Sequence, residues 1–371
     1  MVSPNDIGMN QRFRNHEEER LTSLSAAAWV AFPRHCYHLP IMSVRVRPRR
    51  VTLVGPDLFV TRAIDFLAGF GLDIGRARAP GLGEVAARLH LLRRVVGSDV
   101  IIYFSGRPSL HRLTALLSRI GVPVVMYWVG TDVLFRWGAP TEDVIERAWH
   151  WCAAPWLPEE LAERGIDSSF IVLIPPAIPA AIPALPKQFS VLAYVPEHRR
   201  DFYRLDFIVQ LAQRLPDVEF QIVRSSALDG LPPNVRCLGW VEDMDALISR
   251  TTAYVRPIAH DGLSNMVLEA LAYGRYVLWT YPFQGVMTLD TVEAAEAWLR
   301  DLHRRHKEGR LAPNEVGRKA VEAMFDSAIV GGRALQAIES VASQRWRRPP
   351  SGIQRSLRTS ALSILRVLLR T

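Results

Sequence analysis

The sequence predicts an α/β protein made of two parallel-sheet domains that face a central cleft. Its 371 residues are more than one hydrophobic core usually supports. Short, continuous apolar runs alternate with helical segments, which is typical of parallel sheets covered on both faces. Residues 175–186 interrupt this alternation with five prolines, and proline favours an extended, semi-rigid connection. We therefore expect two domains joined by this linker, with a ligand site in the cleft between them.

The first domain is predicted to begin at residue 50. Its opening strand, 51–54, stops at Gly55-Pro56, and residues 57–70 then space their apolar residues as a helix does. The apolar runs 99–104 and 122–128 are the other clear strands of this half. Further helices are predicted at 83–96, at 109–120, near 141–150 and near 158–164, and further strands at 152–153 and 170–174.

The second domain repeats the alternation after the linker. Pro216 separates a predicted helix at 204–214 from the strand 218–223, and Gly274 follows a helix predicted at 264–273. The remaining predicted strands are 190–195, 235–238, 252–256 and 276–280, and the remaining helices are 243–249, 291–307 and 313–342.

These elements divide the chain into four predicted segments. Residues 1–49 are an N-terminal extension that we expect to be disordered, with a translation start at Met42 as the alternative. The N-terminal domain is predicted to span residues 50–180 and the C-terminal domain residues 181–343. A basic segment, residues 344–371, closes the chain.

The net charge of +8 resides in the two ends of the chain. Residues 344–371 hold seven arginines and no acid, and residues 1–50 hold eight arginines against four acids. Subtraction, 8 − 7 − 4, leaves −3 for residues 51–343. A nucleic-acid binder more often spreads basic residues over a folded face. We therefore expect no nucleic-acid partner, and attraction of the basic ends to an anionic membrane surface.

The C-terminal segment has the pattern of a basic amphipathic helix. Within residues 354–370, apolar side chains fall on one helical face and arginines on another, which suits a membrane interface. A closing helix packed on the protein body is the alternative. The apolar face holds Leu357, Ile364, Leu365 and Leu368, and the basic face Arg355, Arg366 and Arg370.

Cysteine usage and hydropathy favour a cytoplasmic protein, peripheral on the inner face of the plasma membrane. Three cysteines lie far apart without a CxxC or Cys/His pattern, so we expect a reduced setting and no metal. No apolar run reaches the roughly 18 residues of a membrane span. Residues 21–32 are apolar, but Glu17, Glu18 and Glu19 stand where a signal peptide carries basic residues.

Residues 252–280 carry the strongest functional signal. They read as strand, loop, helix, glycine and strand, with Ser264 or Asn265 as the predicted N-cap. Gly262, before the helix, would let the backbone approach an anion closely. The first-turn amides have no intrahelical partner, and the helix dipole favours negative charge. The pattern therefore predicts a phosphate site at the start of this helix.

Two carboxylates flank this predicted phosphate site. Asp261 precedes the helix and Glu269 lies on it, eight positions later. Glu269 would accept hydrogen bonds from ribose hydroxyls, and Asp261 would engage hydroxyls of a transferred sugar. The alternative is that Asp261 is a turn residue and Glu269 a solvated or ion-paired helix residue.

The same segment resembles the signature of the retaining GT-B glycosyltransferases. That signature is an acidic residue, seven further residues and a glutamate, followed by a helix of the type LEALAxGxPV. Asp261 and Glu269 take the acidic positions, and Tyr276 replaces the usual proline. The aspartate is one methylene shorter than the commoner glutamate. The resemblance implies a GT-B fold of two Rossmann-like domains. The matching residues are Leu268, Glu269, Ala270, Leu271, Ala272, Gly274 and Val277.

The resemblance extends to both domains. Residues 235–241, VRCLGWV, are similar to the short strand and glycine loop beside the base, which implies donor binding at Gly239. Residues 128–132, WVGTD, resemble the HGSD motif of the family, with valine where a histidine often stands. This implies an acceptor side at Gly130 and Thr131 and a catalytic Asp132.

The loop after the first strand of the second domain departs from the family. An Arg and a Lys usually neutralise the leaving diphosphate there, whereas this loop reads PEHRRDFYR. Arg199, Arg200 and Arg204 are the candidates, although none has the expected spacing. An exposed basic loop without a ligand is the alternative.

The resemblance implies sugar transfer from a nucleoside-diphosphate sugar to a hydroxyl acceptor, with retention and no obligatory metal. The acceptor would be a lipid-linked or surface-polysaccharide glycan, and the donor sugar nucleotide would be a co-substrate rather than a cofactor. Amides of Leu263, Ser264 and Asn265 would stabilise the leaving group. The alternatives are a nucleotide-sugar epimerase and a non-catalytic GT-B protein that binds glycan or a partner enzyme.

Overall fold

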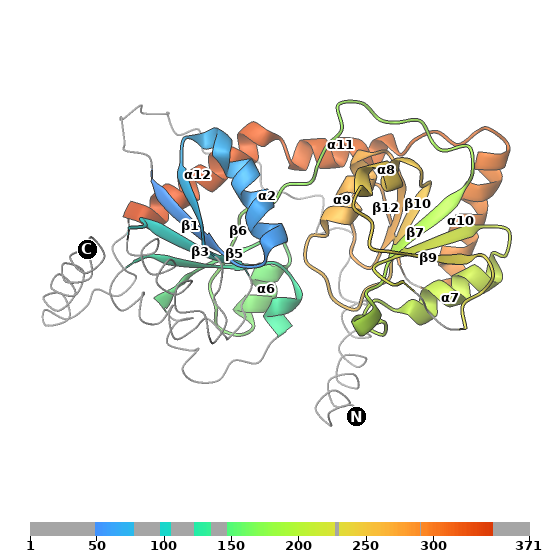
Figure 1. The fold of residues 1–371 in the computed structure, drawn as a ribbon, viewed down its shortest axis with the longest axis horizontal. Coiled ribbons are helices and arrows are strands. Elements are labelled where there is room, and N and C mark those ends of the chain that lie inside the picture. Colours follow the sequence, from blue (N-terminus) through green and yellow to red (C-terminus); the bar gives the residue numbers. More distant parts are fainter. Residues whose placement is uncertain are drawn as a thin grey trace, which may run out of the picture. The chain divides into compact units, whose positions relative to one another are not determined.

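The computed structural model contains two six-stranded parallel sheets, which confirms the predicted fold class (Figure 1). Both sheets belong to one compact unit, Val46–Thr371. The helices predicted at 83–96 and 109–120, the extension and the basic C-terminal segment lie outside the described residues. The structure describes residues 49–77, 97–104, 122–134, 147–226, 230–289 and 291–343.

The first sheet has the strand order β2-β1-β3-β4-β5-β6, with every pair parallel. Strands β3 and β4 are buried at every residue, because they lie inside the sheet and consist almost wholly of apolar residues. The strands are β1 Arg50–Val54, β2 Asp73–Ala77, β3 Val100–Phe104, β4 Val124–Trp128, β5 Trp149–Cys152 and β6 Ser169–Phe170.

The second sheet has the order β12-β11-β10-β7-β8-β9 and is also parallel throughout. Its central strands β7 and β10 are apolar except for Ser190, which begins β7, and Arg256, which ends β10. The strands are β7 Ser190–Tyr194, β8 Glu219–Val223, β9 Val235–Gly239, β10 Ala253–Arg256, β11 Tyr276–Trp279 and β12 Val286–Thr288.

Helices cover both faces of the second sheet. α7 and α10 share an apolar cluster with one face, whereas α8 and α9 share a cluster with the other. Several helices of this domain have side-chain N-caps. The Asp243 carboxylate accepts a hydrogen bond from Ala246 N, and the hydroxyl of Ser264, a predicted N-cap, accepts one from Val267 N. The helices are α2 Asp57–Leu67, α6 Leu157–Ala162, α7 Leu205–Arg214, α8 Met244–Ser249, α9 Asn265–Ala272, α10 Val292–Lys307, α11 Glu315–Met324 and α12 Ser327–Ser343.

Several predicted boundaries were wrong. The helix expected near 141–150 cannot reach its predicted end, because β5 already begins at Trp149. The strand expected at 170–174 is reduced to Ser169–Phe170. The single helix expected at 313–342 is two helices, and the Asp326 carboxylate accepts hydrogen bonds from the amides that open the second one. Strands β2 and β12 were not predicted.

The closing helix α12 packs on the first sheet, although residues 327–343 were assigned to the C-terminal domain. Its Ala334 and Ile338 are fully buried in the cluster that contains Leu53 and Ile102. The chain therefore crosses from the second sheet back to the first. The domain limits at 180 and 343 stay predictions.

The proline-rich linker is attached to the second domain. Arg318 Nη2 donates to the Pro179 carbonyl at 2.8 Å, and Arg275 Nη1 donates to the Ala184 carbonyl at 3.2 Å. Both arginines are buried. Residues 179–184 are therefore fixed to the second domain.

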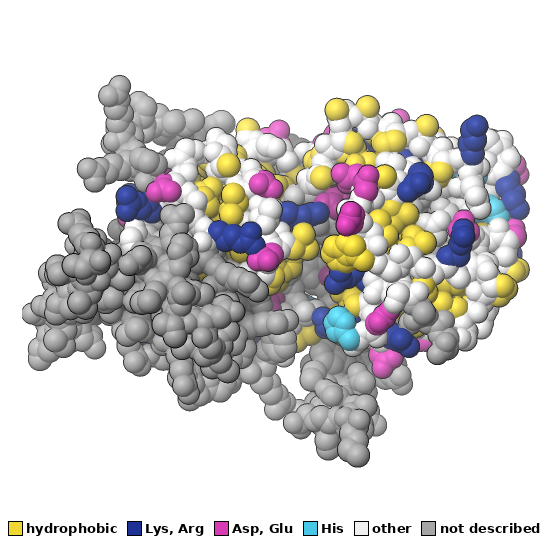
Figure 2. Space-filling model, viewed as in Figure 1, with side chains coloured by type: hydrophobic (Ala, Val, Ile, Leu, Met, Phe, Trp, Pro, Cys, Tyr) yellow, Lys and Arg dark blue, Asp and Glu magenta, His cyan; other side chains and the backbone are white. Residues whose placement is uncertain are grey.

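The surface facing the viewer in Figure 2 mixes acidic and basic side chains across the described residues. No helix within those residues is both long and apolar enough to span a bilayer.

The packing of α12 predicts opposite effects for two neighbouring glycines. A Cβ on Gly331 would lie 1.9 Å from the Phe70 ring, whereas a Cβ on Gly332 meets nothing within 4 Å. Gly332→Ala should stabilise by about 1 kcal/mol through helix propensity, whereas Gly331→Ala should destabilise because Phe70 must move. Unfolding midpoints in urea measure both, and equal midpoints would contradict the α12 packing.

Candidate functional site

The candidate site lies where the carboxyl ends of strands from both sheets are followed by loops. Residues 129–132 follow β4, and residues 257–264 connect β10 to α9. Ligands of parallel α/β sheets generally bind outside the carboxyl ends of the strands. The Ser264 hydroxyl accepts from Val267 N at 3.5 Å, so the predicted N-cap opens α9.

The two loops touch backbone to backbone at a pair of glycines. A Cβ on Gly262 would lie 1.9 Å from the Val129 carbonyl oxygen, and a Cβ on Gly130 would lie 2.6 Å from Gly262 N. Gly130 also has a φ of 154°, which few other residues adopt. Only glycine fits at these positions without separating the loops.

Asp261 is enclosed by hydrogen bonds from protein groups. Its carboxylate accepts from Arg256 Nε at 2.5 Å and Nη2 at 2.9 Å, and from Trp279 Nε1 at 3.2 Å. Its carbonyl accepts from Trp156 Nε1 at 3.0 Å, and its amide donates to the Tyr281 hydroxyl at 3.2 Å. The side chain is buried, so this aspartate does more than close a turn.

Arg256 is buried with its partner carboxylate. Burial would lower the pKa of this guanidinium, but the neighbouring Asp261 carboxylate and Tyr254 hydroxyl hold the pKa well above its ordinary value. Burial also raises the pKa of Tyr254 to about 12. At neutral pH Arg256 is therefore charged and Tyr254 is a neutral phenol.

Helix α6 contributes a second set of contacts to the loop after β10. His260 Nε2 lies 2.8 Å from Glu160 Oε2, and both side chains are buried. Trp156, just before α6, stacks on Tyr281 with ring centroids 4.6 Å apart. These contacts join the first domain to the two residues that precede Gly262.

Glu269 is ion-paired rather than solvated. Its Oε1 accepts from Arg62 Nη1 at 2.8 Å and from Ala177 N at 3.5 Å. Burial raises the pKa of this carboxyl, and Arg62 and the Ala177 amide only partly offset that effect. The Arg62 side chain is 37% exposed, whereas that of Glu269 is 4% exposed, so solvent reaches the pair from the arginine side.

Asp132 shapes the loop after β4. Its Oδ1 accepts from Gly130 N at 2.8 Å and from Val129 N at 3.1 Å, and the side chain is buried. Thr131 begins a short 3₁₀ helix, Thr131–Leu134, that places this carboxylate under the two amides. Asp132 therefore positions Gly130 for its contact with Gly262.

The three loop arginines lie after β7. The Arg199 guanidinium stands 4.1 Å from the centre of the Phe202 ring, and Arg204 stands 5.4 Å from that of Phe207. Arg200 is exposed. The Phe202 carbonyl accepts from Ala259 N at 3.0 Å, which joins this loop to the one that contains Asp261.

Gly239 ends β9, which is separated from β10 by β7 and β8. Its φ of 65° suits glycine. The next residue, Trp240, is 70% exposed, and the Arg224 guanidinium stands 4.5 Å from the centre of its indole ring. The structure thus brings the predicted residues 130–132 and 261–265 together, and places Gly239 at the far edge of the sheet.

Sequence reasoning missed the partners of the predicted carboxylates. Arg256 could have been found, because an arginine that ends a buried apolar strand needs a counter-charge. Arg62, Trp156 and Glu160 lie on or beside helices of the first domain, where spacing gives no signal of contact with a residue about 100 or more positions away.

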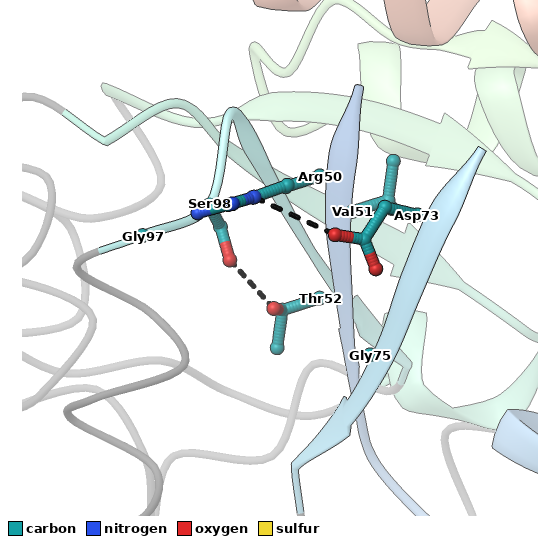
Figure 3. Close-up of a pocket in the computed structure, with 7 residues that line it drawn as sticks. All are labelled: Arg50, Val51, Thr52, Asp73, Gly75, Gly97 and Ser98. Carbon is teal, nitrogen blue, oxygen red and sulfur yellow. Dashed lines mark hydrogen bonds and ion pairs between the residues drawn. The ribbon is translucent and has the colours of Figure 1, made fainter. Parts of the chain in front are cut away.

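The described residues also line a cavity of about 290 Å³. Figure 3 shows the Arg50–Asp73 ion pair and the hydrogen bond between the Thr52 and Ser98 hydroxyls in its wall. Arg50 and Asp73 begin β1 and β2, and Ser98 precedes β3, so the cavity lies toward the amino ends of these strands, whereas Gly130 follows the carboxyl end of β4. It is not the candidate site. No cluster of His, Cys, Asp and Glu suited to a metal occurs among the described residues.

Comparison with known proteins agrees with the predicted resemblance to the GT-B glycosyltransferases. Residues 196–297 match the family "Glycosyl transferases group 1", and this segment includes the loop and helix with Asp261 and Glu269. The predicted resemblance is thus confirmed for the superfamily and not for its retaining branch. No curated protein sequence matches the chain significantly.

Solved structures show the same fold. Sucrose-phosphate synthase from Thermosynechococcus elongatus has a TM-score of 0.61 at 13% identity, covering 79% of this chain and 99% of its own. The pneumococcal O-GlcNAc transferase GtfA, in complex with UDP and GlcNAc, has a TM-score of 0.51 at 11% identity, covering 70% and 60%. A variant of S. aureus TarM, in complex with Fondaparinux, alpha-GlcNAc-glycerol and UDP, has a TM-score of 0.53 at 12% identity, covering 70% and 59%. The chain thus spans about three fifths of the length of GtfA and of TarM.

The glycine contact predicts a loss of stability on adding one methyl group. Gly262→Ala would drive its Cβ into the Val129 carbonyl, and Gly69, with nothing within 4 Å of its Cβ, supplies the control. Gly262→Ala should lower the stability by about 1–3 kcal/mol relative to Gly69→Ala. Thermal unfolding of the two variants tests this, and coinciding curves would show that the loops do not touch.

Glu269 predicts a pH-dependent difference between the protein and its Gln variant. A raised folded pKa means that Glu269 contributes stability below its ordinary pKa near 4.5 and that this contribution is lost as pH rises through the folded value. Glutamine resembles the protonated carboxyl at every pH. Glu269→Gln should therefore gain stability relative to the unchanged protein over the pH interval that begins at 4.5 and ends at the raised folded pKa, as measured by urea unfolding. A relative loss over this interval would contradict the burial of a charged Glu269.

Proposed function

We propose that this protein is a glycosyltransferase that moves a sugar from a nucleoside-diphosphate sugar to a hydroxyl acceptor, with retention of configuration. The observation that carries the proposal is the match of residues 196–297 to a glycosyltransferase family, since it covers α9 and both acidic positions. The GT-B fold and the position of this helix at the carboxyl ends of the strands support it.

The donor diphosphate would bind the amides at the start of α9. Leu263, Ser264 and Asn265 form the opening of that helix, where unpaired amides and the helix dipole stabilise negative charge. The same groups would stabilise the charge that develops on the leaving nucleoside diphosphate as the glycosidic bond breaks. Arg199, Arg200 and Arg204 are the loop cations proposed to add to this effect.

Glu269 would hold the ribose of the donor. To do so it must exchange Arg62 for two ribose hydroxyls. The Arg62 side of that pair is open to solvent, so the guanidinium can return to water when it leaves the carboxylate. Donor binding would therefore free Arg62 at small cost while keeping the buried carboxylate satisfied.

The acceptor would approach from the first domain. Gly130, Thr131 and Asp132 lie on the loop that touches Gly262, so an acceptor hydroxyl near them would stand beside the donor. Closure of the domains would exclude water and so limit hydrolysis of the donor. We propose a lipid-linked or surface-polysaccharide glycan as acceptor, a cytoplasmic location, and attachment of residues 344–371 to the inner face of the plasma membrane.

A non-catalytic GT-B protein is the second candidate. The ion pairs of Asp261 and Glu269 favour it, because both carboxylates already have arginine partners and a scaffold need not release them.

Donor titration separates the two candidates. We expect UDP, GDP or ADP, or a sugar conjugate of one of them, to raise the unfolding temperature, because a ligand that binds only the folded state stabilises it. Glu269→Gln should weaken that nucleotide at least tenfold in calorimetry, since it loses a charged acceptor for the ribose hydroxyls. Its matched control is Glu296→Gln, on an exposed ion pair of α10. Absence of binding by all three nucleotides and their sugars would favour the scaffold.

A further inference from the structure

Asp261 was expected to contact the donor sugar, but its ion pair with Arg256 indicates that the arginine would contact the donor instead. We propose that Arg256 is the cation that binds the donor diphosphate, and that Asp261 is a positioning residue that acts through Arg256 rather than a ligand of the sugar. This inference rests on the proposed function. It assigns a new phosphate ligand outside the loop after β7.

The first observation is that protein groups already occupy most of the hydrogen-bonding capacity of the Asp261 carboxylate. Three N–H groups donate to its two oxygens, two from Arg256 and one from Trp279. Both partners of the ion pair have side chains only 9% exposed. A sugar hydroxyl would therefore have to reach a buried carboxylate that the protein already holds, and breaking the ion pair would leave an uncompensated charge.

The second observation is that the guanidinium is anchored by one edge. Nε and Nη2 face Asp261 in the bidentate geometry that fixes an arginine plane. The centres of the Tyr203 and Tyr194 rings lie 5.4 Å and 5.9 Å from Cζ, within the range of cation–π contacts. Arg256 is thus held in one orientation before any ligand arrives.

The third observation is where the opposite edge lies. Nη1 is 3.4 Å from the Tyr254 hydroxyl, a distance beyond that of most hydrogen bonds. That hydroxyl in turn lies 3.9 Å from Met266 Sδ, in the first turn of α9. Nη1 therefore stands beside the opening of the helix proposed to receive the diphosphate, with N–H capacity left for a phosphate oxygen.

Arginine suits this position because it stays charged and can present two N–H groups to one phosphate. Arg199 is also near, since its Cζ lies 6.0 Å from the centre of the same Tyr203 ring. A diphosphate at the start of α9 would thus meet a fixed guanidinium at the end of β10. The loop arginine Arg199 would add a second positive charge close to the same ring.

Calorimetry with UDP and with UDP-GlcNAc distinguishes a phosphate-binding pair from a sugar-binding aspartate. GDP and ADP with their sugars replace them if UDP does not bind the unchanged protein. Arg256→Gln and Asp261→Asn should weaken UDP and UDP-GlcNAc by the same factor, at least tenfold. Arg256→Lys, which keeps the charge, should recover part of the loss. Arg214→Gln, on an exposed ion pair of α7, should leave both affinities unchanged.

Selectivity for the phosphates is the readout that a purely structural role would not move. Uridine, followed by ligand-observed NMR, should bind the variants as it binds the unchanged protein. The double variant Arg256→Gln with Asp261→Asn leaves no unpaired buried charge and so guards against misfolding. It should bind UDP as weakly as Arg256→Gln alone.

Two results would overturn the inference while the proposed function stands. One is an Asp261→Asn variant that loses affinity for UDP-GlcNAc but not for UDP, since Asp261 would then contact the sugar itself. The other is an Arg256→Gln variant with unchanged affinity for UDP. Failure of the unchanged protein to bind UDP, GDP or ADP would instead contradict the proposed function, and this inference with it.

Discussion

The contact between Gly130 and Gly262 is the constraint on which the candidate site depends. It brings the loop after β4 and the loop after β10 to within van der Waals distance of each other's backbone, where no side chain fits. Each loop must be held accurately for this to happen. Asp132 fixes the first loop through the amides of Val129 and Gly130. Arg256, Trp156 and Tyr281 fix the second through Asp261.

Two ion pairs neutralise the charges near this contact, and they differ in burial and in the number of hydrogen bonds. Arg256 and Asp261 are both buried and share two hydrogen bonds, so neither can leave without stranding the other. Arg62 and Glu269 share one hydrogen bond, and the arginine is open to solvent. The first pair therefore suits a fixed part of a binding site, and the second a part that rearranges when a ligand arrives.

Sequence patterns predicted the helices and strands that have strong local signals, such as an apolar run, an N-cap or a terminating glycine. The segment from β10 to β11 was predicted within a residue or two, because its apolar strands, Ser264 cap and Gly274 stop act locally. Strands β2 and β12 escaped prediction. β2 contains Asp73, Gly75 and Arg76, and β12 has three residues, so neither shows an apolar run. Both lie at sheet edges and depend on a neighbouring strand for their hydrogen bonds.

The motif residues of the candidate site could be predicted from the sequence, but their distant partners could not. The positions of Asp261, Gly262 and Glu269 follow from a local pattern and a family resemblance, whereas some of their partners come from the far domain. Arg62 is 207 residues from Glu269, and Trp156 is 105 residues from Asp261. Periodicity within a helix indicates which face is buried, but it does not indicate which distant loop will cover that face.

Helix α12 gives the molecule a second covalent tie between its domains. One tie is the linker, whose residues 179–184 are fixed to the second domain by Arg275 and Arg318. The other is the bend at Phe325 and Asp326, where the backbone leaves α11 to return to the first sheet. Two covalent connections restrict the relative motion of two domains more than one connection does. Any opening of this protein would therefore swing about a single axis through the two joints, and twisting in other directions would be suppressed.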